Sequence, residues 1–514
     1  MRRIFIFTLI FLLFSNAFAV LEIPNAQPKV GAMQWKQVLD STWQGIKRRN
    51  INPYNTGLIH RPKSETPGDA VSEGVGYGML LALFANDQET FNSIYSAAGR
   101  YNLSYCQDWH YLPGSGGQKD PGDTGSATDA DEDIALALIF AAKLVEKGLW
   151  TNSSINYASA AQGGISCVRG SMQGGLLCPG NHWCPGYNIG YFAPAWYKIF
   201  GMTDAANSSY ESIKSTSSYD IGMVPDWSGG NGGYNTYMSG NAFFKDAIRT
   251  LWRVANDYIW FGDQRAKEFL ENSLKFIKSK GGPDAANFYQ LDGTKKGELL
   301  PAGDKWMEFN GKNNKNTWRY RSEHSHLTVG QWLTVAMAVG DSADKVAWSK
   351  KMAEFYDWEN KVDFFGNAVD PTGGIEDTLH NEMYFDQFLA WFGVSLMSGT
   401  WVNVVALLDN PVQNTEGITE QPFKEPEPPV PPEPPDPVIA KVPAKLDLKI
   451  SQSKGSLSLH SKSDVVWKIH NLQGKLLFSS NSREVTWSTG NLTGTVVVSA
   501  KNGSNLEKKL LVLH

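Results

Sequence analysis

The stretch ATDADEDIALALIF, residues 127–140, places four acidic side chains directly before an unbroken apolar run. Acidic residues are favoured near the positive end of a helix and Thr128 is a suitable capping residue, so the stretch predicts a helix start. The following apolar run has no polar face, which is typical of a helix buried on all sides. Because four crowded carboxylates repel one another, helix capping alone does not explain them. At least one of them is expected to have another task.

A calcium loop of the EF-hand type is excluded for this stretch. Ile134 stands where that loop requires glycine, and Phe140 stands where it requires its last glutamate. No catalytic metal and no cofactor is expected from the sequence.

Similar apolar runs recur between residues 20 and 413, separated by loops rich in Gly, Asn, Asp and Pro. They cover residues 78–84, 193–200, 247–260, 329–339 and 385–397. At about 30 residues per helix and loop, this body holds about a dozen helices. Such a number suits a closed ring of paired helices, although periodicity alone also fits other large helical folds.

The composition limits the classes of protein to consider. The chain has 514 residues, a formal net charge of −5 and 12% aromatic residues. It is long enough for several domains and apolar enough to bury a large core. Basic residues do not outnumber acidic ones, which argues against a nucleic-acid partner. Aromatic rings suit sugar faces, but most aromatic residues of any protein belong to its core.

Residues 1–19 and 414–514 differ in their sequence pattern from the helical part of the chain, residues 20–413. Residues 1–19 combine two arginines, an apolar run over residues 4–14 and an A-x-A site ending at Ala19, which predicts a cleaved signal peptide. The mature protein is therefore expected to be secreted or attached to the cell surface. Residues 414–443 include EPEPPVPPEPPDP and predict an extended spacer. Residues 444–514 alternate polar and apolar side chains in short runs, which predicts a small all-β domain.

Export permits disulfides. The four cysteines are Cys106, Cys167, Cys178 and Cys184, which allow three pairings. A zinc site that includes His182 is the alternative. Since the chain has no CxxC pair, disulfides are favoured and their pairing stays open.

Two further carboxylates stand in distinctive settings. Glu73 lies in VSEGVGYG, residues 71–78, where closely spaced glycines let the backbone approach a ligand. Asp246 lies in FKDAIRTLWR, residues 244–253, and shares a helical face with Arg249 and Arg253. The alternatives are a capping glutamate for the first and a surface ion-pair ladder for the second. The apolar neighbours of Asp246 argue against the surface ladder.

Five blocks together resemble glycoside hydrolase family 8, formerly cellulase family D. They are SEGVGYGML (72–80), ATDADEDIA (127–135), NIGYFAP (188–194), VPDW (224–227) and YFDQ (384–387), in the order of the family. The resemblance covers roughly residues 30–400. It implies an (α/α)6 barrel that hydrolyses β-1,4-linked polysaccharides with inversion.

The resemblance also implies roles for individual residues. Glu73 falls on the general acid, Asp246 on the base and Asp129 on the carboxylate that holds the distorted sugar. The residues expected to bind substrate are Trp109, Tyr191, Arg249 and Tyr384.

Two positions depart from the family pattern. The chain has Lys245 where relatives usually carry Tyr before the base, and Leu251 where they carry Pro. The Tyr helps to shape the cleavage site, so the substrate preference is left open by this departure.

The expected activity is that of an endo-β-1,4-glucanase. An endo-β-1,4-xylanase, a lichenase or a chitosanase of the same family is the alternative. A non-catalytic glycan-binding protein of the cell surface is the alternative from another class. Retention of all three carboxylates argues against the binder, because binding needs no acid opposite a base. The protein is expected to be a monomer whose partner is a β-1,4-linked polysaccharide.

The tail resembles the C-terminal sorting domains of the bacterial type IX secretion pathway, in which case it engages the secretion machinery. The matching motifs are IHNLQGK (469–475), LTGT (492–495) and KKLLV (508–512). The alternative is a carbohydrate-binding module that uses Trp467 and Trp487.

Overall fold

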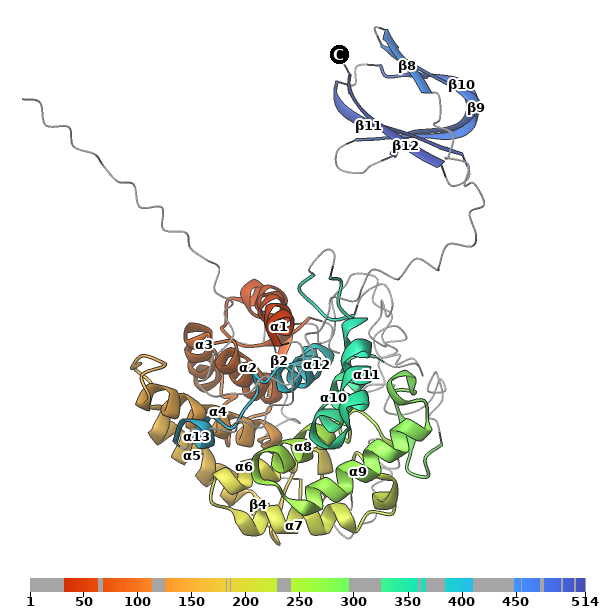
Figure 1. The fold of residues 1–514 in the computed structure, drawn as a ribbon. Helices are drawn as coiled ribbons and strands as arrows, with labels where there is room; N and C mark the ends of the chain where they lie inside the picture. Colours follow the sequence, from red (N-terminus) through yellow and green to blue (C-terminus); the bar gives the residue numbers. More distant parts are fainter. Residues whose placement is uncertain are drawn as a thin grey trace, which may run out of the picture. The chain divides into compact units, whose positions relative to one another are not determined.

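Six inner helices follow one another around the N-terminal unit of this computed structural model (Figure 1). They are α2 (Ser72–Phe84), α4 (Thr128–Glu146), α6 (Pro194–Ile199), α8 (Arg249–Phe261), α10 (His326–Val339) and α12 (Tyr384–Met397). Each packs against the next in this order. Rings from α2 and α12 close the circle, since Tyr77 contacts Phe388 and Phe392 at centroid distances of 6.1 and 5.2 Å.

An outer helix covers each inner one. The outer helices are α1 (Ala32–Ile46) on α12, α3 (Gln88–Arg100) on α2, α5 (Tyr157–Gly170) on α4, α7 (Thr203–Lys214) on α6, α9 (Gln264–Ser279) on α8 and α11 (Ser342–Ala353) on α10. A short helix, α13 (Val404–Asp409), packs on α4. The described helices therefore form an α/α barrel, and the predicted mainly helical body is confirmed.

The apolar runs of the sequence became the inner helices. Every residue of α12 is buried, and every residue of α2 except Glu73. A helix enclosed on all sides has no solvent face to supply with polar residues. The outer helices are amphipathic instead, as in α9, where the buried positions recur at helical spacing.

The structure describes residues 32–62, 68–112, 125–181, 183–184, 186–228, 242–294, 325–358, 362–366, 384–409, 448–453, 455–471, 476–490, 493–502 and 505–513. The predicted signal peptide (1–19) and proline spacer (414–443) lie outside these residues. The chain divides into two compact units, Met1–Phe423 and Lys424–His514, with the division inside the predicted spacer. None of the described helices has the length and apolar character needed to cross a membrane.

Short strands and turns lead into the barrel helices. β1 (His60–Arg61), β2 (Asp69–Val71) and β3 (His110–Tyr111) form an antiparallel sheet in that order, and α2 begins directly after β2. β4 (Met172–Gln173) pairs with β5 (Leu176–Leu177), and β6 (Ala242–Phe243) with β7 (Tyr289–Gln290). The short helical turns are η1 (Lys47–Ile51), η2 (Asn52–Tyr54), η3 (Ile189–Tyr191), η4 (Tyr219–Ile221) and η6 (Gly282–Asp284).

The C-terminal unit is an antiparallel sheet in the described residues. Its strands are β8 (Leu448–Ser453), β9 (Ser456–Asn471), β10 (Leu476–Ser488), β11 (Gly494–Asn502) and β12 (Asn505–Leu513), ordered β10-β9-β11-β12 with β8 also on β9. Trp467 is fully buried in the core of this sheet. Trp487 packs against the same core and stacks on Phe478 at 5.9 Å. Trp467 therefore has no surface to offer a sugar.

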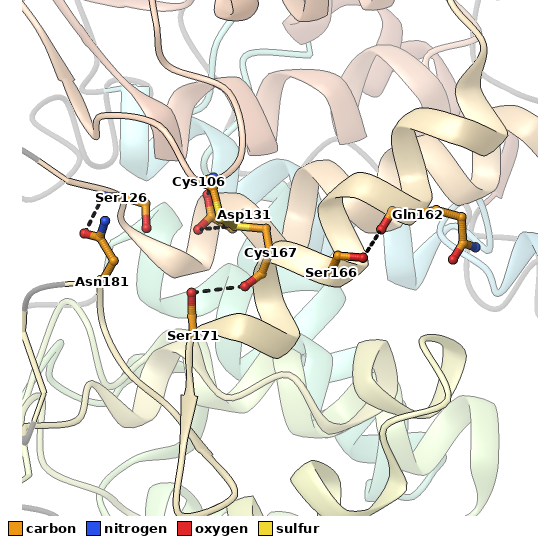
Figure 2. The surroundings of a disulfide bond; sticks show 8 residues. All are labelled: Cys106, Ser126, Asp131, Gln162, Ser166, Cys167, Ser171 and Asn181. Atoms are coloured by element: carbon orange, nitrogen blue, oxygen red, sulfur yellow. Dashed lines mark hydrogen bonds between the residues drawn. A yellow bond between two sulfur atoms is a disulfide. The ribbon is translucent and has the colours of Figure 1, made fainter.

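The cysteines form two disulfides, Cys106–Cys167 and Cys178–Cys184. The first joins the segment after α3 to α5 (Figure 2). Within the described residues, Cys106, Asp131 and Cys167 are the group with metal-ligand spacing, but its two sulfur atoms are bonded to each other. The prediction of disulfides over zinc is confirmed, and His182 lies outside the described residues.

Candidate active site

The three predicted carboxylates converge on one buried guanidinium group. Arg249 is the first residue of α8 and its side chain is 1% exposed. Its Nη1 donates to Glu73 Oε2 at 2.7 Å and to Asp129 Oδ2 at 2.8 Å. Its Nη2 donates to Asp246 Oδ1 at 2.8 Å. The two nitrogens thus join carboxylates from α2, from α4 and from the turn before α8.

Glu73 is the residue of α2 that reaches the solvent side of this cluster. Its side chain is 18% exposed, whereas the rest of the helix is buried. Oε1 accepts a hydrogen bond from the hydroxyl of Tyr384, the first residue of α12. The N–H of Ser72 donates to the carbonyl oxygen of Trp109 at 2.9 Å, which places the Trp109 backbone beside the start of α2.

Asp246 is the most exposed of the three carboxylates, with 31% of its side chain accessible. The indole Nε1 of Trp227 donates to its Oδ2 at 3.2 Å. The turn that carries it is held by Asp226, whose Oδ1 accepts the N–H groups of Phe244 at 3.0 Å and Ala247 at 2.9 Å. Asp226 and Trp227 belong to the VPDW block. The sequence marked this block as a family motif but did not indicate a role for either residue.

Asp129 lies deepest and is 1% exposed. Burial raises the pKa of Asp129 to about 7, although the neighbouring Arg249 acts in the opposite direction. Its charge state therefore depends on the guanidinium that it shares with Glu73 and Asp246.

A second buried ion cluster lies one helical turn further along α8. Arg253 donates to both oxygens of Asp133, at 2.7 and 2.9 Å, and lies 3.0 Å from Glu132. Burial raises the pKa of Glu132 well above its usual value. Both arginines are buried, so the alternative of a surface ion-pair ladder is wrong.

The four crowded acids of α4 are therefore divided among three partners. Asp129 pairs with Arg249, whereas Asp133 and Glu132 face Arg253. Asp131 instead accepts the backbone N–H of Cys106 at 3.0 Å.

Aromatic side chains surround the central arginine. The ring of Tyr191 lies 4.8 Å from the Arg249 guanidinium carbon and 6.4 Å from the ring of Trp227. A Cβ on Gly190 would lie 2.0 Å from the carbonyl oxygen of Asp246, so glycine allows this close approach. The sequence did not indicate this contact.

Trp109 stacks on His110 at 4.6 Å and contacts the edge of Trp183 at 6.3 Å. Its indole Nε1 is buried and has no hydrogen-bond partner among the described residues. The exposed Trp183, 39% accessible, was not singled out from the sequence.

Lys245 occupies the position where the chain departs from the family pattern. Its ammonium lies 5.6 Å from the ring of Phe385. Burial lowers the pKa of Lys245 to about 8, against the opposing effect of Asp386, Asp246 and Glu73. An ammonium group with a lowered pKa is thus the neighbour in sequence of Asp246, the predicted base.

The chain resembles known proteins in both sequence and structure. Residues 30–284 match the model of a family described as Glycosyl hydrolases family 8. Endoglucanase A of Acetivibrio thermocellus is 36% identical over 295 residues, which cover 53% of this chain and 59% of that protein. Endoglucanase 2 of Ruminiclostridium josui is 35% identical over 274 residues, which cover 50% and 58%. The chain thus spans less than two thirds of the length of either relative.

A solved structure has the same fold. The β-1,3-1,4-glucanase from Paenibacillus sp. X4 superposes with a TM-score of 0.56 and 21% identity, over 75% of this chain and 100% of the other.

Proposed function

The helical unit carries a glycoside hydrolase family 8 domain, and on this premise we propose that the protein is an inverting endo-β-1,4-glucanase. One observation supports this above all others. Glu73 and Asp246, the predicted acid and base, are each one hydrogen bond away from opposite nitrogens of Arg249. Both side chains are partly exposed, at 18% and 31%, so both are open to a substrate. Inverting hydrolysis needs such a carboxyl pair with room for a water molecule.

In the proposed mechanism, protonated Glu73 donates its proton to the leaving glycosidic oxygen. Asp246 accepts a proton from a water molecule, whose oxygen attacks the anomeric carbon from the opposite face. Arg249 and Trp227 orient Asp246 through their hydrogen bonds. Glu73 accepts from Tyr384 in this structure, but a phenolic hydroxyl can also accept. Reversal of that bond accommodates the protonated acid.

Asp129 and the aromatic side chains are assigned to the sugar. Asp129 holds the ring at the cleavage site, while Trp109 and Tyr191 provide aromatic faces for binding. Tyr384 donates a hydrogen bond to the acid Glu73 and is assigned to substrate binding by the family resemblance. Endoglucanase relatives at 35–36% identity favour a cellulose-type glucan over xylan.

Substitution of the acid and the base tests this proposal. Glu73→Gln and Asp246→Asn should each lower kcat at least about a hundredfold, because each removes one proton-transfer group. Glu89→Gln is the control, since Glu89 is an exposed glutamate in the first turn of α3, as Glu73 is in α2. The measurement is release of reducing ends from carboxymethylcellulose, xylan, mixed-linkage glucan and chitosan.

The outcomes separate the alternatives. Turnover by either variant close to that of the parent would refute the assigned role. Preference for xylan, mixed-linkage glucan or chitosan would identify the corresponding activity of the family. No release from any β-glycan would favour a glycan-binding protein. Inversion is tested by proton NMR, which should show the α-anomer as the first product.

We also propose export and sorting for the two ends of the chain. The support is the signal-like pattern of residues 1–19 and the sorting-type motifs of residues 444–514. The buried position of Trp467 argues against a sugar-binding surface at that residue. A monomer acting on a polysaccharide outside the cell is the corresponding biological unit.

A further inference from the structure

Three segments of the barrel meet at Cys106 (Figure 2). Cys106 belongs to the segment between α3 and β3, and its disulfide binds that segment to Cys167 on α5. Its backbone N–H donates to Asp131 Oδ1 on α4 at 3.0 Å. A covalent bond and a hydrogen bond to the buried carboxyl of Asp131 thus fix one residue to two different helices.

This fixed residue lies three positions before Trp109. The intervening Asp108 accepts a hydrogen bond from the Asn102 amide and, at 3.1 Å, from the N–H of Gly125. Trp109 itself donates its N–H to the Gly125 carbonyl at 2.8 Å. The short chain from Cys106 to Trp109 is therefore anchored along its length.

Asp131 also lies close in sequence to Asp129, a residue of the candidate active site. Asp131 is fully buried and lies two residues after Asp129 in the first turn of α4. At the other end, the Trp109 carbonyl accepts the N–H of Ser72, next to Glu73. Asp131 and Cys106 thus connect the Asp129 turn to the tryptophan beside the predicted acid.

The packing leaves little freedom for this connection to move. A Cβ on Gly163 of α5 would lie 2.5 Å from the Tyr105 hydroxyl, and one on Gly164 would lie 2.9 Å from the Ala135 Cβ of α4. Cys106 also has a φ of 58°, a conformation that non-glycine residues adopt at a cost. Its surroundings must therefore hold it there.

We propose that Asp131 and the Cys106–Cys167 bond are positioning elements that set the place of the Trp109 indole relative to Asp129 and Glu73. They thereby set the affinity for the glycan chain and not the rate of bond cleavage. This inference rests on the proposed function, because it assigns Trp109 to the sugar.

Kinetics on soluble cello-oligosaccharides test the inference. Cys106→Ser with Cys167→Ser removes the cross-link, and Asp131→Ala removes the acceptor for the Cys106 N–H. Each should raise KM about tenfold, as expected for a displaced aromatic contact, while kcat stays within about twofold. The triple variant should show less than the product of the two effects, since both act on one segment.

Two matched controls accompany these variants. Asp131→Asn keeps an oxygen that accepts the Cys106 N–H, so its KM should stay near that of the parent. Ser166→Ala changes the exposed neighbour of Cys167, whose hydroxyl donates within α5 to the Gln162 carbonyl oxygen at 2.8 Å (Figure 2). It should leave KM unchanged. A lowered Tm with an unchanged KM would show a purely stabilising role and overturn the inference.

Hydrogen exchange gives a readout that needs no substrate. Amides of residues 104–110 should exchange faster in the Cys106/Cys167 variant and in Asp131→Ala, while those of α2 keep their protection. Unchanged exchange at residues 104–110 would overturn the positioning role even if the parent hydrolyses glucan. An inactive parent would instead refute the proposed function, and the exchange data would still decide whether the segment is held in this way.

Discussion

Arg249 is the residue on which the candidate active site depends. Its two terminal nitrogens serve Glu73, Asp129 and Asp246, which come from different elements. A planar guanidinium offers several donors in fixed directions, whereas a lysine ammonium is a compact point charge. One buried cation can therefore orient three carboxylates at the same time.

Replacement of this arginine by lysine should impair catalysis while the positive charge remains. Arg249→Lys is expected to lower kcat by about a hundredfold, because the fixed donor geometry for Glu73 and Asp246 is lost. Arg265→Lys is the control, since Arg265 is 42% exposed and pairs with Asp263. Steady-state hydrolysis of carboxymethylcellulose is the measurement. A kcat within a few-fold of the parent would mean that charge alone suffices at this position.

Asp131 predicts a pH dependence of stability. Burial raises the pKa of Asp131 from 3.8 to about 7 in the folded protein. Between these two values the folded state holds a proton that the unfolded chain releases, so stability falls as the pH rises from about 4 to about 7. Asp131→Asn cannot ionise and should escape this loss. Its advantage over the parent should grow from near zero at pH 4 to at most about 4 kcal/mol at pH 8.

Urea midpoints of the parent and Asp131→Asn at pH 4.5, 6 and 8 measure this difference. Parallel dependence of the two midpoints on pH would contradict the prediction, since it would mean that Asp131 does not titrate differently in the folded state.

At the scale of elements, the inner helices α10 and α12 approach each other at a pair of glycines. A Cβ on Gly393 would lie 2.1 Å from the carbonyl oxygen of Gly330 and 2.9 Å from its Cα. These atoms are rigid backbone, so the helices would have to separate to admit a methyl group. The missing side chains thus set the distance between two barrel helices.

Gly393→Ala should therefore lower the stability of the helical unit by roughly 3 kcal/mol. Gly99→Ala is the matched control. Gly99 lies in the outer helix α3, and a Cβ added to it would meet no atom within 4 Å. The control should be neutral or up to about 1 kcal/mol more stable. Thermal unfolding followed by circular dichroism compares the two. Equal midpoints would show that the α10–α12 contact tolerates the methyl group.

The sequence predicted the inner helices and the three carboxylates, but it did not predict the contact of Asp131. The apolar runs marked six inner helices, because a helix buried on all sides is apolar at most of its positions. The family motifs brought forward Glu73, Asp129 and Asp246, which the structure places around one arginine. Asp131 was only one of four crowded acids in the sequence. Its partner is a backbone N–H of Cys106, 25 residues earlier, and no side-chain pattern encodes such a contact.

At the scale of the whole molecule, the two units have separate cores. One cluster of buried residues covers the helical unit, and another lies within the C-terminal sheet. A cooperative unit is held by its own core, so neither unit is expected to need the other for its fold.

Deletion of residues 424–514 should therefore leave the Tm of the helical unit and kcat on soluble glucan unchanged. With the sorting function proposed for the tail, the same deletion should abolish export from a host with the type IX pathway. Cell fractionation and pull-down on insoluble cellulose are the measurements. Normal export with lost cellulose binding would instead identify a glycan-binding module, and lost activity on soluble glucan would contradict the independence of the units.

The sequence by itself determined the helical class, the positions of the inner helices and the identity of the three carboxylates. These features depend on local composition and on short motifs, which a linear chain displays directly. The tertiary structure decided the disulfide pairing, the shared role of Arg249 and the connection from Asp131 to Trp109. Arg249 lies 176 residues from Glu73 and 120 from Asp129, so only closure of the helical ring brings their side chains within hydrogen-bonding distance.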